Sequence, residues 1–182
     1  MTRPRRPLPP LNAADLERFA LRYVERYATT RGKLADYLRR KLRERGWEGE
    51  GTPDPVGLAQ RMADLGYVND RLFAESKATA LVRRGLGARR VDQALRHAGI
   101  DREDLDAVAP AVAEDSLASA VAFARRRRIG PFAQEAAARP VQEKQLAAML
   151  RAGHSMEIAR KIIRMAPGED TEGLFVPTWD RF

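Results

Sequence analysis

Side chains that commonly carry out catalysis or bind metals are scarce in this sequence of 182 residues. The chain has no cysteine, which excludes disulfides, thiolate nucleophiles and cysteine-ligated zinc. Its two histidines, His97 and His154, lie far apart, each near a glycine at a predicted helix end, where a polar ring caps the helix or faces water. No GxGxxG or GxxxxGKS/T motif occurs, and no nucleophile has a nearby base. We therefore expect no catalysis, no metal and no cofactor.

Four acidic side chains cluster at Asp101, Glu103, Asp104 and Asp106. Such a group could bind a cation. The cluster falls at a predicted helix start, however, where the helix dipole stabilises carboxylates. Capping, with Asp101 as the cap, is the better explanation.

Arginine is the residue type whose pattern most suggests a function. The formal net charge of +8, concentrated in the first fifty residues, indicates an anionic partner such as nucleic acid, an acidic protein surface or a membrane. The run Arg125 to Arg128 must point in all directions around a helix, which favours a solvated helix end over one recognition face. Elsewhere basic residues recur at helical spacing beside apolar stripes.

We predict that these recurring basic side chains contact the anionic partner, because arginine can bind phosphate or carboxylate through two parallel hydrogen bonds. The alternative is that surface helices use arginine only for solubility. The candidate residues are Arg39, Arg40, Arg43, Arg83, Arg84, Arg89, Arg90, Arg96, Arg160, Lys161 and Arg164.

The elements that carry these residues are predicted to be helices. Good helix formers dominate, and β-branched and aromatic residues are sparse. Helix starts are predicted at Asn12, at Thr29 or Thr30, at Asp54-Pro55, at Asn69 or Asp70, and at Ser155.

Apolar spacing predicts which side chains face inward. Tyr23, Tyr27 and Leu65 fall on the apolar stripes of their helices. Pro110 is predicted to separate a short helix from a long one that continues to the break at Gly130-Pro131.

An internal repeat organises the helices. Phe19-Ala20 and Arg31-Gly32 align with Phe73-Ala74 and Arg84-Gly85 at an offset of 53 to 54 residues, and a third, diverged copy follows. Each copy is predicted to be a three-helix module with a marginal core, so that stacking in series buries the exposed faces. We predict an all-α fold, an elongated, curved tandem array of three-helix repeats.

The predicted organisation has five parts. They are a disordered, basic and proline-rich tail at 1–11, a first repeat at 12–50, a second at 54–100, a third at 101–166, and an irregular segment at 167–182. We expect Phe175, Trp179 and Phe182 in the last part to pack back on the third repeat.

The segment from Gly66 to Ala74, with the sequence GYVNDRLFA, is the most distinctive in the chain. It predicts a helix that stops at Gly66, a short turn, and a capped helix start. Tyr67 and Phe73 are predicted core anchors, and Asp70 a predicted cap. Architecture alone accounts for these residues.

This segment resembles the GY(V/I)(D/N)DxxFA signature of the RecX family. Three further segments are similar to family motifs in the same order: Tyr37 to Leu42 to YLxRKL, Arg84 to Ile100 to RxxG…RxIxxxLxxKGI, and Arg151 to Ser155 to the RGFS turn. The sequence departs from the pattern at Ala98, Ala152 and His154, and in an extra stretch at 131–140. The resemblance covers about Leu16 to Met165.

The resemblance implies a non-enzymatic, cofactor-free regulator of the RecA recombinase in recombinational DNA repair and the SOS response. It also implies a curved right-handed array that binds in the groove of the RecA–single-stranded DNA filament and limits its growth or promotes its disassembly. We expect a monomer with weak, sequence-independent DNA binding. From the residues alone, a stand-alone helix-turn-helix DNA-binding regulator or a protein-only scaffold remains possible.

A cytoplasmic protein is expected. The first ten residues are rich in arginine and proline and lack the apolar core of a secretory signal. The longest apolar runs, such as 107–113, are too short for a membrane span.

Overall fold

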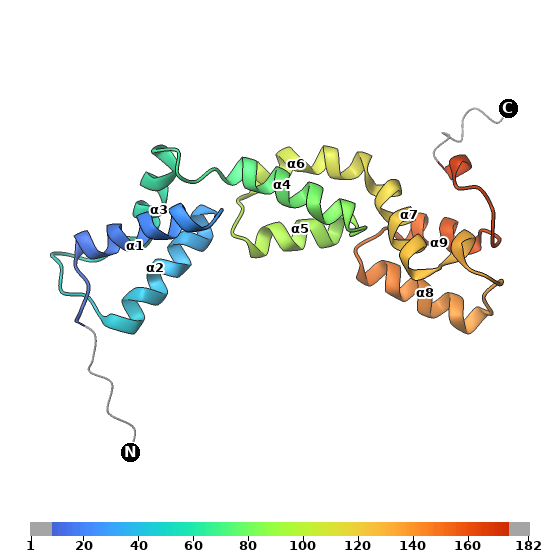
Figure 1. Ribbon diagram of the computed structural model, residues 1–182, viewed down its shortest axis with the longest axis horizontal. Coiled ribbons are helices and arrows are strands. Elements are labelled where there is room, and N and C mark those ends of the chain that lie inside the picture. Colours follow the sequence, from blue (N-terminus) through green and yellow to red (C-terminus); the bar gives the residue numbers. More distant parts are fainter. Residues whose placement is uncertain (1–8, 175–182) are drawn as a thin grey trace, which may run out of the picture. The chain divides into compact units, whose positions relative to one another are not determined.

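The computed structural model describes residues 9–174, and this part of the chain consists of α-helices joined by turns and loops, with two short 3-10 helices and no strand (Figure 1). The predicted all-α class is confirmed. The helices are α1 (Ala13–Arg26), α2 (Arg31–Arg45), α3 (Pro55–Asp64), α4 (Asp70–Arg83), α5 (Ala88–His97), α6 (Arg102–Glu114), α7 (Ser116–Arg127), α8 (Arg139–Arg151) and α9 (Met156–Arg164). The predictions for residues 1–8 and for Phe175, Trp179 and Phe182 lie outside the described residues.

Most helices begin at the predicted caps. Asn12 and Asp15 form a reciprocal capping box at the start of α1. The side chains of Thr30, Asp54 and Ser155 each accept a backbone N–H in the first turn of α2, α3 and α9, respectively. These starts are set by local chemistry, which is why the sequence predicts them.

The predicted break at Pro110 is wrong, because α6 runs through this residue. Proline fixes φ near its helical value and removes one backbone donor, so a helix can continue where packing holds it. Val108 and Val112 are buried on either side of Pro110, whose own ring lies on the exposed side. The break comes at Asp115, and α7 follows.

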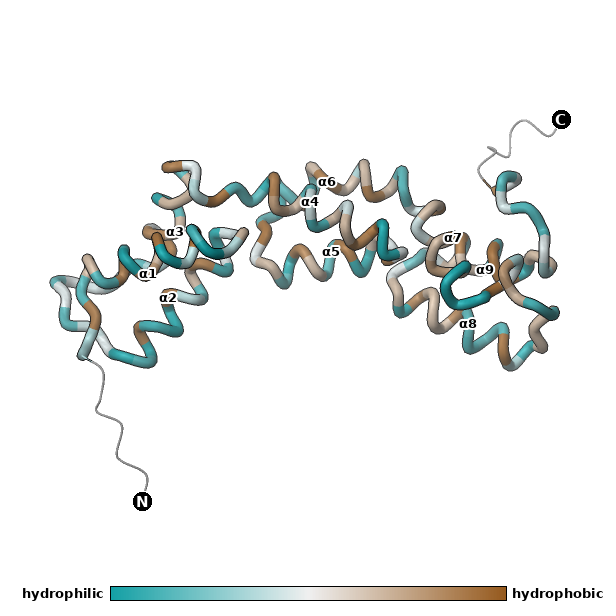
Figure 2. The backbone as a smooth tube through the Cα atoms, in the orientation of Figure 1, coloured by the Kyte–Doolittle hydropathy of each residue, from teal (hydrophilic) through white to brown (hydrophobic). Residues whose placement is uncertain are grey.

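The described chain divides into two compact units. The first runs to Phe73 and includes His97–Asp101; the second comprises Ala74–Arg96 and the chain from Arg102 onward. In Figure 2 the helices of both units alternate between apolar and polar residues, as expected for amphipathic helices.

One core of the first unit is shared by α1, α2 and α3. Its buried residues are Leu11, Leu16, Ala20, Leu34, Ala35, Leu38, Leu58, Ala59, Met62 and Val68. The sequence predicts that the helix starting at Asp54 opens the second repeat. Its buried side chains instead pack with the first two helices.

Leu11 differs from its predicted place at the end of a disordered tail. Its side chain is fully buried. Its N–H donates to the carbonyl of Gly46 at 3.0 Å, and its carbonyl accepts the N–H of Glu48 at 2.9 Å. The apolar side chain and these two bonds tie the start of the chain to the end of α2.

The second unit has a core formed by α7, α8 and α9. Its buried residues are Ala120, Val121, Phe123, Ala124, Ile129, Met149, Ala152, Ala159, Ile162 and Ile163. The inward positions predicted for α9 are confirmed.

Three apolar or aromatic side chains predicted to face inward are exposed. Tyr27 is 48% exposed, Leu65 67% and Tyr67 54%. Leu65 ends α3, and Gly66 turns the chain with φ of +80°, so the helical spacing stops there. Val68 takes the buried position that was assigned to Tyr67.

Candidate functional site

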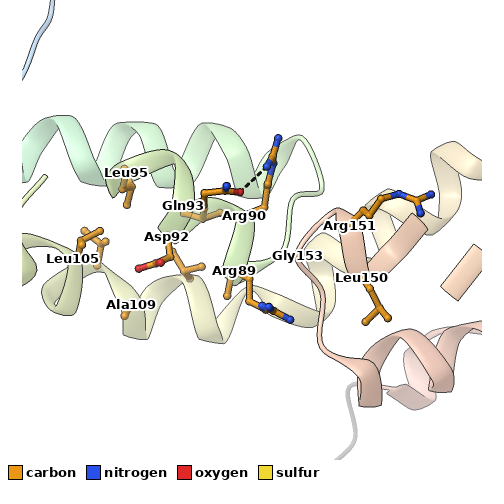
Figure 3. Close-up of a pocket in the computed structure, with 14 residues that line it drawn as sticks. Arg89, Arg90, Asp92, Gln93, Leu95, Leu105, Ala109, Leu150, Arg151 and Gly153 are labelled. Carbon is orange, nitrogen blue, oxygen red and sulfur yellow. Dashed lines mark hydrogen bonds between the residues drawn. The ribbon is translucent and has the colours of Figure 1, made fainter. Parts of the chain in front are cut away.

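A cavity of about 650 Å³ opens between α5, α6 and the end of α8 in the second unit (Figure 3). This volume is within the range of about 300–1,000 Å³ that is usual for ligand sites. The larger apolar side chains of the lining are those of Val91, Leu95, Leu105, Val108, Val112 and Leu150. Polar side chains supply the rest: Arg89, Arg90, Asp92, Gln93 and Arg151. We call this cavity the arginine-lined groove.

Backbone contacts between α5 and the turn after α8 set the position of the groove. The N–H of Gly87 donates to the carbonyl of Ala152 at 2.9 Å, and the N–H of Arg89 donates to that of Gly153 at 3.3 Å. The first N–H groups of a helix have no partner within the helix, so these carbonyls cap α5. A Cβ atom on Gly87 would lie 2.3 Å from the carbonyl carbon of Gly153, so the close approach requires glycine.

His154 is the residue after Gly153, and its ring is buried next to the same turn. It is 2% exposed, its ring lies 5.4 Å from the ring of Phe123, and Nε2 donates to the carbonyl of Gly85 at 3.2 Å. Burial lowers the pKa of His154, and the hydrogen bond to Gly85 opposes that shift. Of the two roles predicted for this ring, capping a helix and facing water, the ring has the first: it caps the end of α4 and is buried. His97 is exposed.

All eleven basic candidates are exposed. On α5, Arg96 is held by two hydrogen bonds from its guanidinium to Asp92, at 2.8 and 3.0 Å, which raise the pKa of Arg96. Arg90 donates to Gln93 at 2.6 Å (Figure 3). Within the described residues, Arg89 has no acidic partner at ion-pair distance. Arg89 and Arg90 line the groove, whereas Arg96 does not.

The candidates on α2 lie in the first unit. Arg39 forms an ion pair with Asp36 at 2.8 Å, and Arg40 lies 3.7 Å from Glu44. A hydrogen bond from Lys41 lowers the pKa of Glu44. Exposed ion pairs within one helix contribute little stability. For Arg39 and Arg40 they fit the alternative that surface arginines serve only solubility.

The remaining candidates lie in the second unit. Lys161 pairs with Glu157 at 2.8 Å, and this hydrogen bond lowers the pKa of Glu157. Arg160 and Arg164 line a smaller hollow of about 280 Å³ with Arg139. Arg83 and Arg84 stand exposed at the end of α4.

The run from Arg125 to Arg128 is exposed, as predicted for a helix end. Its guanidinium groups also pack on their own unit. Arg125 lies over the ring of Phe132 at 4.9 Å, and Arg126 donates to the carbonyl of Arg84. This run therefore has a structural role in addition to its charge.

One groove residue, Arg151, is not among the basic residues that the sequence predicted to contact a partner. It lines the groove at the end of α8, close in sequence to the glycine that contacts α5. Within the described residues it has no acidic partner at ion-pair distance. Its only sequence signal is that it opens the turn from Arg151 to Ser155.

The distinctive segment from Gly66 to Ala74 is architectural. Asn69, rather than Asp70, caps α4, since its side chain accepts the N–H of Leu72 at 2.8 Å. Asp70 instead caps α2 from a distance: it accepts the backbone N–H of Arg31 at 2.9 Å and its Nε at 3.0 Å. The hydrogen bond to Asp70 raises the pKa of Arg31. The prediction that Asp70 caps its own helix is therefore wrong, because its carboxylate is taken up by Arg31 of α2.

The other aromatic residue of this segment, Phe73, is half-buried. The ammonium group of Lys33 lies 5.0 Å from the centre of its ring. Phe73 therefore anchors α4 near α2, although it is not fully enclosed.

No metal site is built by the described residues, because no group of three or more histidine, cysteine, aspartate or glutamate side chains comes together there. Within the same part of the chain, no single helix is long and apolar enough to cross a membrane. Only α6 taken together with residues Ser116–Phe132, at a 63° bend, meets the length and composition that a span requires.

The described residues form capped helices that expose arginines on several faces. A model of the second three-helix domain of RecX matches residues 69–108. Regulatory protein RecX of Myxococcus xanthus is 35% identical over 160 residues, which cover 84% of this chain and 86% of that protein. The chain belongs to the RecX family of regulatory proteins, and it is not an enzyme.

Further relatives agree with this assignment. Regulatory protein RecX of Agrobacterium fabrum is 29% identical over 154 residues, covering 82% of each chain. The crystal structure of RecX from Lactobacillus salivarius has the same fold, with a TM-score of 0.62 and 22% identity over 83% of this chain and 94% of that one. A second RecX crystal structure matches with a TM-score of 0.56 over 82% and 72%.

Proposed function

We propose that this protein regulates the RecA recombinase by binding in the groove of the RecA–single-stranded DNA filament and limiting its growth or activity. Membership of the RecX family supports a regulatory role, and the exposed arginines on α2, α5 and α9 support an anionic partner. A regulator of this kind acts in the cytoplasm, where recombinase and DNA meet.

The observation that carries the proposal is the arginine-lined groove. Arg89 and Arg151 present guanidinium groups that the described residues leave without an acidic partner, beside a lining of leucine and valine. A surface that combines unpaired cations with apolar side chains suits a protein carrying carboxylates beside apolar groups. We propose that the groove contacts RecA itself.

Several weak contacts would suffice. A filament presents the same surface on each successive RecA protomer, so a protein with more than one basic face can engage neighbouring protomers at once. Linked contacts raise overall affinity without any single strong interface. The basic faces of α2 and α9 are the further contacts that this proposal assigns.

We also propose that the three-helix modules are α1 to α3, α4 to α6 and α7 to α9. The shared cores of the first and last sets support these boundaries. The family match supports the middle set, since it begins at Asn69, the residue that caps α4.

The test compares inhibition of RecA's DNA-dependent ATP hydrolysis by the wild-type protein and by a triple variant, Arg89→Ala, Arg90→Ala, Arg151→Ala. We expect the concentration for half-inhibition to rise at least about tenfold, since a loss of about 1.4 kcal/mol already has that effect. A charge-matched control replaces Lys77, Arg102 and Lys144, which lie outside the groove, and should inhibit like the wild type.

Circular dichroism and thermal unfolding establish that both triple variants are folded. Equal inhibition by the folded groove variant and the wild type would remove the groove from the mechanism. Sequence-specific duplex binding without any effect on RecA would favour the helix-turn-helix alternative.

A further inference from the structure

Three tyrosines gather on the surface of the first unit where α1 packs against α2. The rings of Tyr23 and Tyr37 are stacked, with centroids 4.2 Å apart and planes 21° apart. The ring of Tyr27 lies 5.2 Å from that of Tyr23, tilted by 51°. Tyr23 and Tyr37 are half-buried, and Tyr27 is 48% exposed. We call these three residues the tyrosine platform.

Basic side chains surround the platform. The guanidinium of Arg40 lies 5.4 Å from the ring centre of Tyr37, and that of Arg26 lies 5.5 Å from the ring centre of Tyr27. Cations held over tyrosine faces in this way are attracted by the ring electrons. They also concentrate positive charge around the partly exposed rings.

Two hollows adjoin the platform, each of about 440 Å³, and both are lined by Tyr23, Tyr37 and Arg40. Their basic lining residues are Arg22, Arg26, Lys33, Arg40, Lys41 and Arg43. Their only acidic lining residue is Asp36, which is engaged by Arg39. The hollows therefore attract anions, and their walls are partly aromatic.

This combination matches the chemistry of a single-stranded nucleic acid. Such strands bind where successive bases stack on aromatic rings while a basic groove follows the phosphates. A duplex keeps its base faces stacked on one another, so it could use only the charges. An acidic peptide would likewise pair with the guanidinium groups and leave the tyrosine faces unused.

We propose that the tyrosine platform is a binding site for single-stranded nucleic acid, with bases stacked on Tyr27 and beside Tyr23 and Tyr37, and phosphates held by the surrounding cations. The inference rests on ring geometry and charge in the first unit, and not on the contact with RecA. Within the proposed function, it gives the protein a hold on the DNA strand that is separate from the arginine-lined groove.

The test measures direct binding of the full-length protein, without recombinase, to a fluorescent oligothymidylate of about 20 nucleotides, longer than a typical site of about 4–16 nucleotides. Tyr27→Ala should weaken binding at least about fivefold, the loss expected for one stacked base. Tyr27→Phe keeps the ring and should bind like the wild type. Tyr67→Ala is the matched control, because Tyr67 is as exposed as Tyr27 and lies outside the platform.

The proposal expects single strands to bind more tightly than a duplex of the same length, and only single-strand binding to depend on Tyr27. Equal losses on both substrates, or an equal loss in the Tyr67 variant, would overturn it. Displacement of the oligonucleotide by poly-glutamate at the same charge concentration would point instead to an acidic protein ligand.

Thermal unfolding of each variant shows that a loss of binding is not a loss of fold. The triple variant of Arg89, Arg90 and Arg151 separates the two proposals. We expect it to bind the oligonucleotide normally while it loses inhibition of RecA. If the platform does not bind single strands, inhibition of RecA is still expected. If the protein does not inhibit RecA, binding of the oligonucleotide by the platform is still expected.

Discussion

Two helix starts of this protein meet distant turns through paired glycines but with different side chains around them. In the first unit, the first turn of α2 meets the turn after α5, where Gly32 and Gly99 approach so closely that a Cβ on Gly32 would lie 2.8 Å from the Cα of Gly99. In the second unit, the loop that leads into α5 meets the turn after α8 through Gly87 and Gly153. Paired glycines thus recur where the start of a helix contacts the turn after another helix.

The first contact, which we call the ion-pair joint, is held by charge. Arg31 binds Asp70 and also reaches Asp101 at 2.6 Å and Gln60 at 3.0 Å. Thr30 adds a hydrogen bond from its hydroxyl to the carbonyl of Ala98. Asp70 is buried, and it accepts hydrogen bonds from the backbone N–H and the guanidinium of Arg31.

The second contact, the histidine joint, is held mainly by backbone groups. Carbonyls of Ala152 and Gly153 cap α5, and His154 caps the end of α4. No ion pair bridges this joint among the described residues. Glycine at the closest point is therefore common to both joints, whereas the polar groups around it differ in kind.

Removal of the buried carboxylate should have the largest effect. Asp70→Ala leaves the backbone N–H and guanidinium of Arg31 without their partner, and loss of one member of a buried pair costs about 3–5 kcal/mol. We expect the lower end of that range, because Arg31 is partly exposed. Urea unfolding measures the change. Asp70→Asn, which keeps an acceptor, should lose less, and equal stability of Asp70→Ala and wild type would show that charge does not hold the ion-pair joint.

A methyl group added at the closest point of each joint should lower the free energy of unfolding by different amounts. Gly87→Ala places Cβ 2.3 Å from backbone atoms that cannot move aside, so we expect a loss of about 1–3 kcal/mol or more. Gly32→Ala meets Gly99 at 2.8 Å, but it also gains up to about 1 kcal/mol of helix propensity within α2. Its net loss should therefore be smaller. Unfolding curves in which Gly32→Ala is the less stable variant would contradict this order.

The smallest effect is a pH dependence confined to the histidine joint. Burial lowers the pKa of His154 in the folded protein, while an unfolded histidine takes up a proton near pH 6.5. The free energy of unfolding should therefore fall as the pH drops below about 6.5, down to the folded-state pKa. His154→Gln keeps a donor for the Gly85 carbonyl but does not titrate. Identical slopes for wild type and His154→Gln between pH 5 and about 7 would exclude this role.

Features set by neighbouring residues could be predicted from the sequence. The caps at Asn12, Thr30, Asp54 and Ser155 are such features, and so is the inward face of α9, because hydrogen bonds and spacing within one turn decide them. The all-α class followed from the same local signals.

Features set by distant partners could not be predicted. Asp70 caps a helix that begins 39 residues earlier, and no local pattern identifies that partner. Helical spacing gave Tyr27 an inward face but could not show that about half of its surface stays exposed. The core shared by α3 with α1 and α2 likewise depends on which apolar faces meet, which spacing alone leaves open.

The candidate site followed the same division. Helical spacing predicted basic faces beside apolar stripes, and all eleven candidates are exposed. The groove could not be predicted, because three helices distant in the sequence line it and the backbone contacts that join α5 to the turn after α8 follow no local pattern. Arg151 belongs to the groove for that reason alone.

Steady-state ATP hydrolysis by RecA on single-stranded DNA, measured while the wild-type protein is titrated into the reaction, tests the central claim most directly. The rate of ATP hydrolysis should fall progressively as the protein is added. A rate that stays constant up to equimolar amounts of protein and RecA would contradict it.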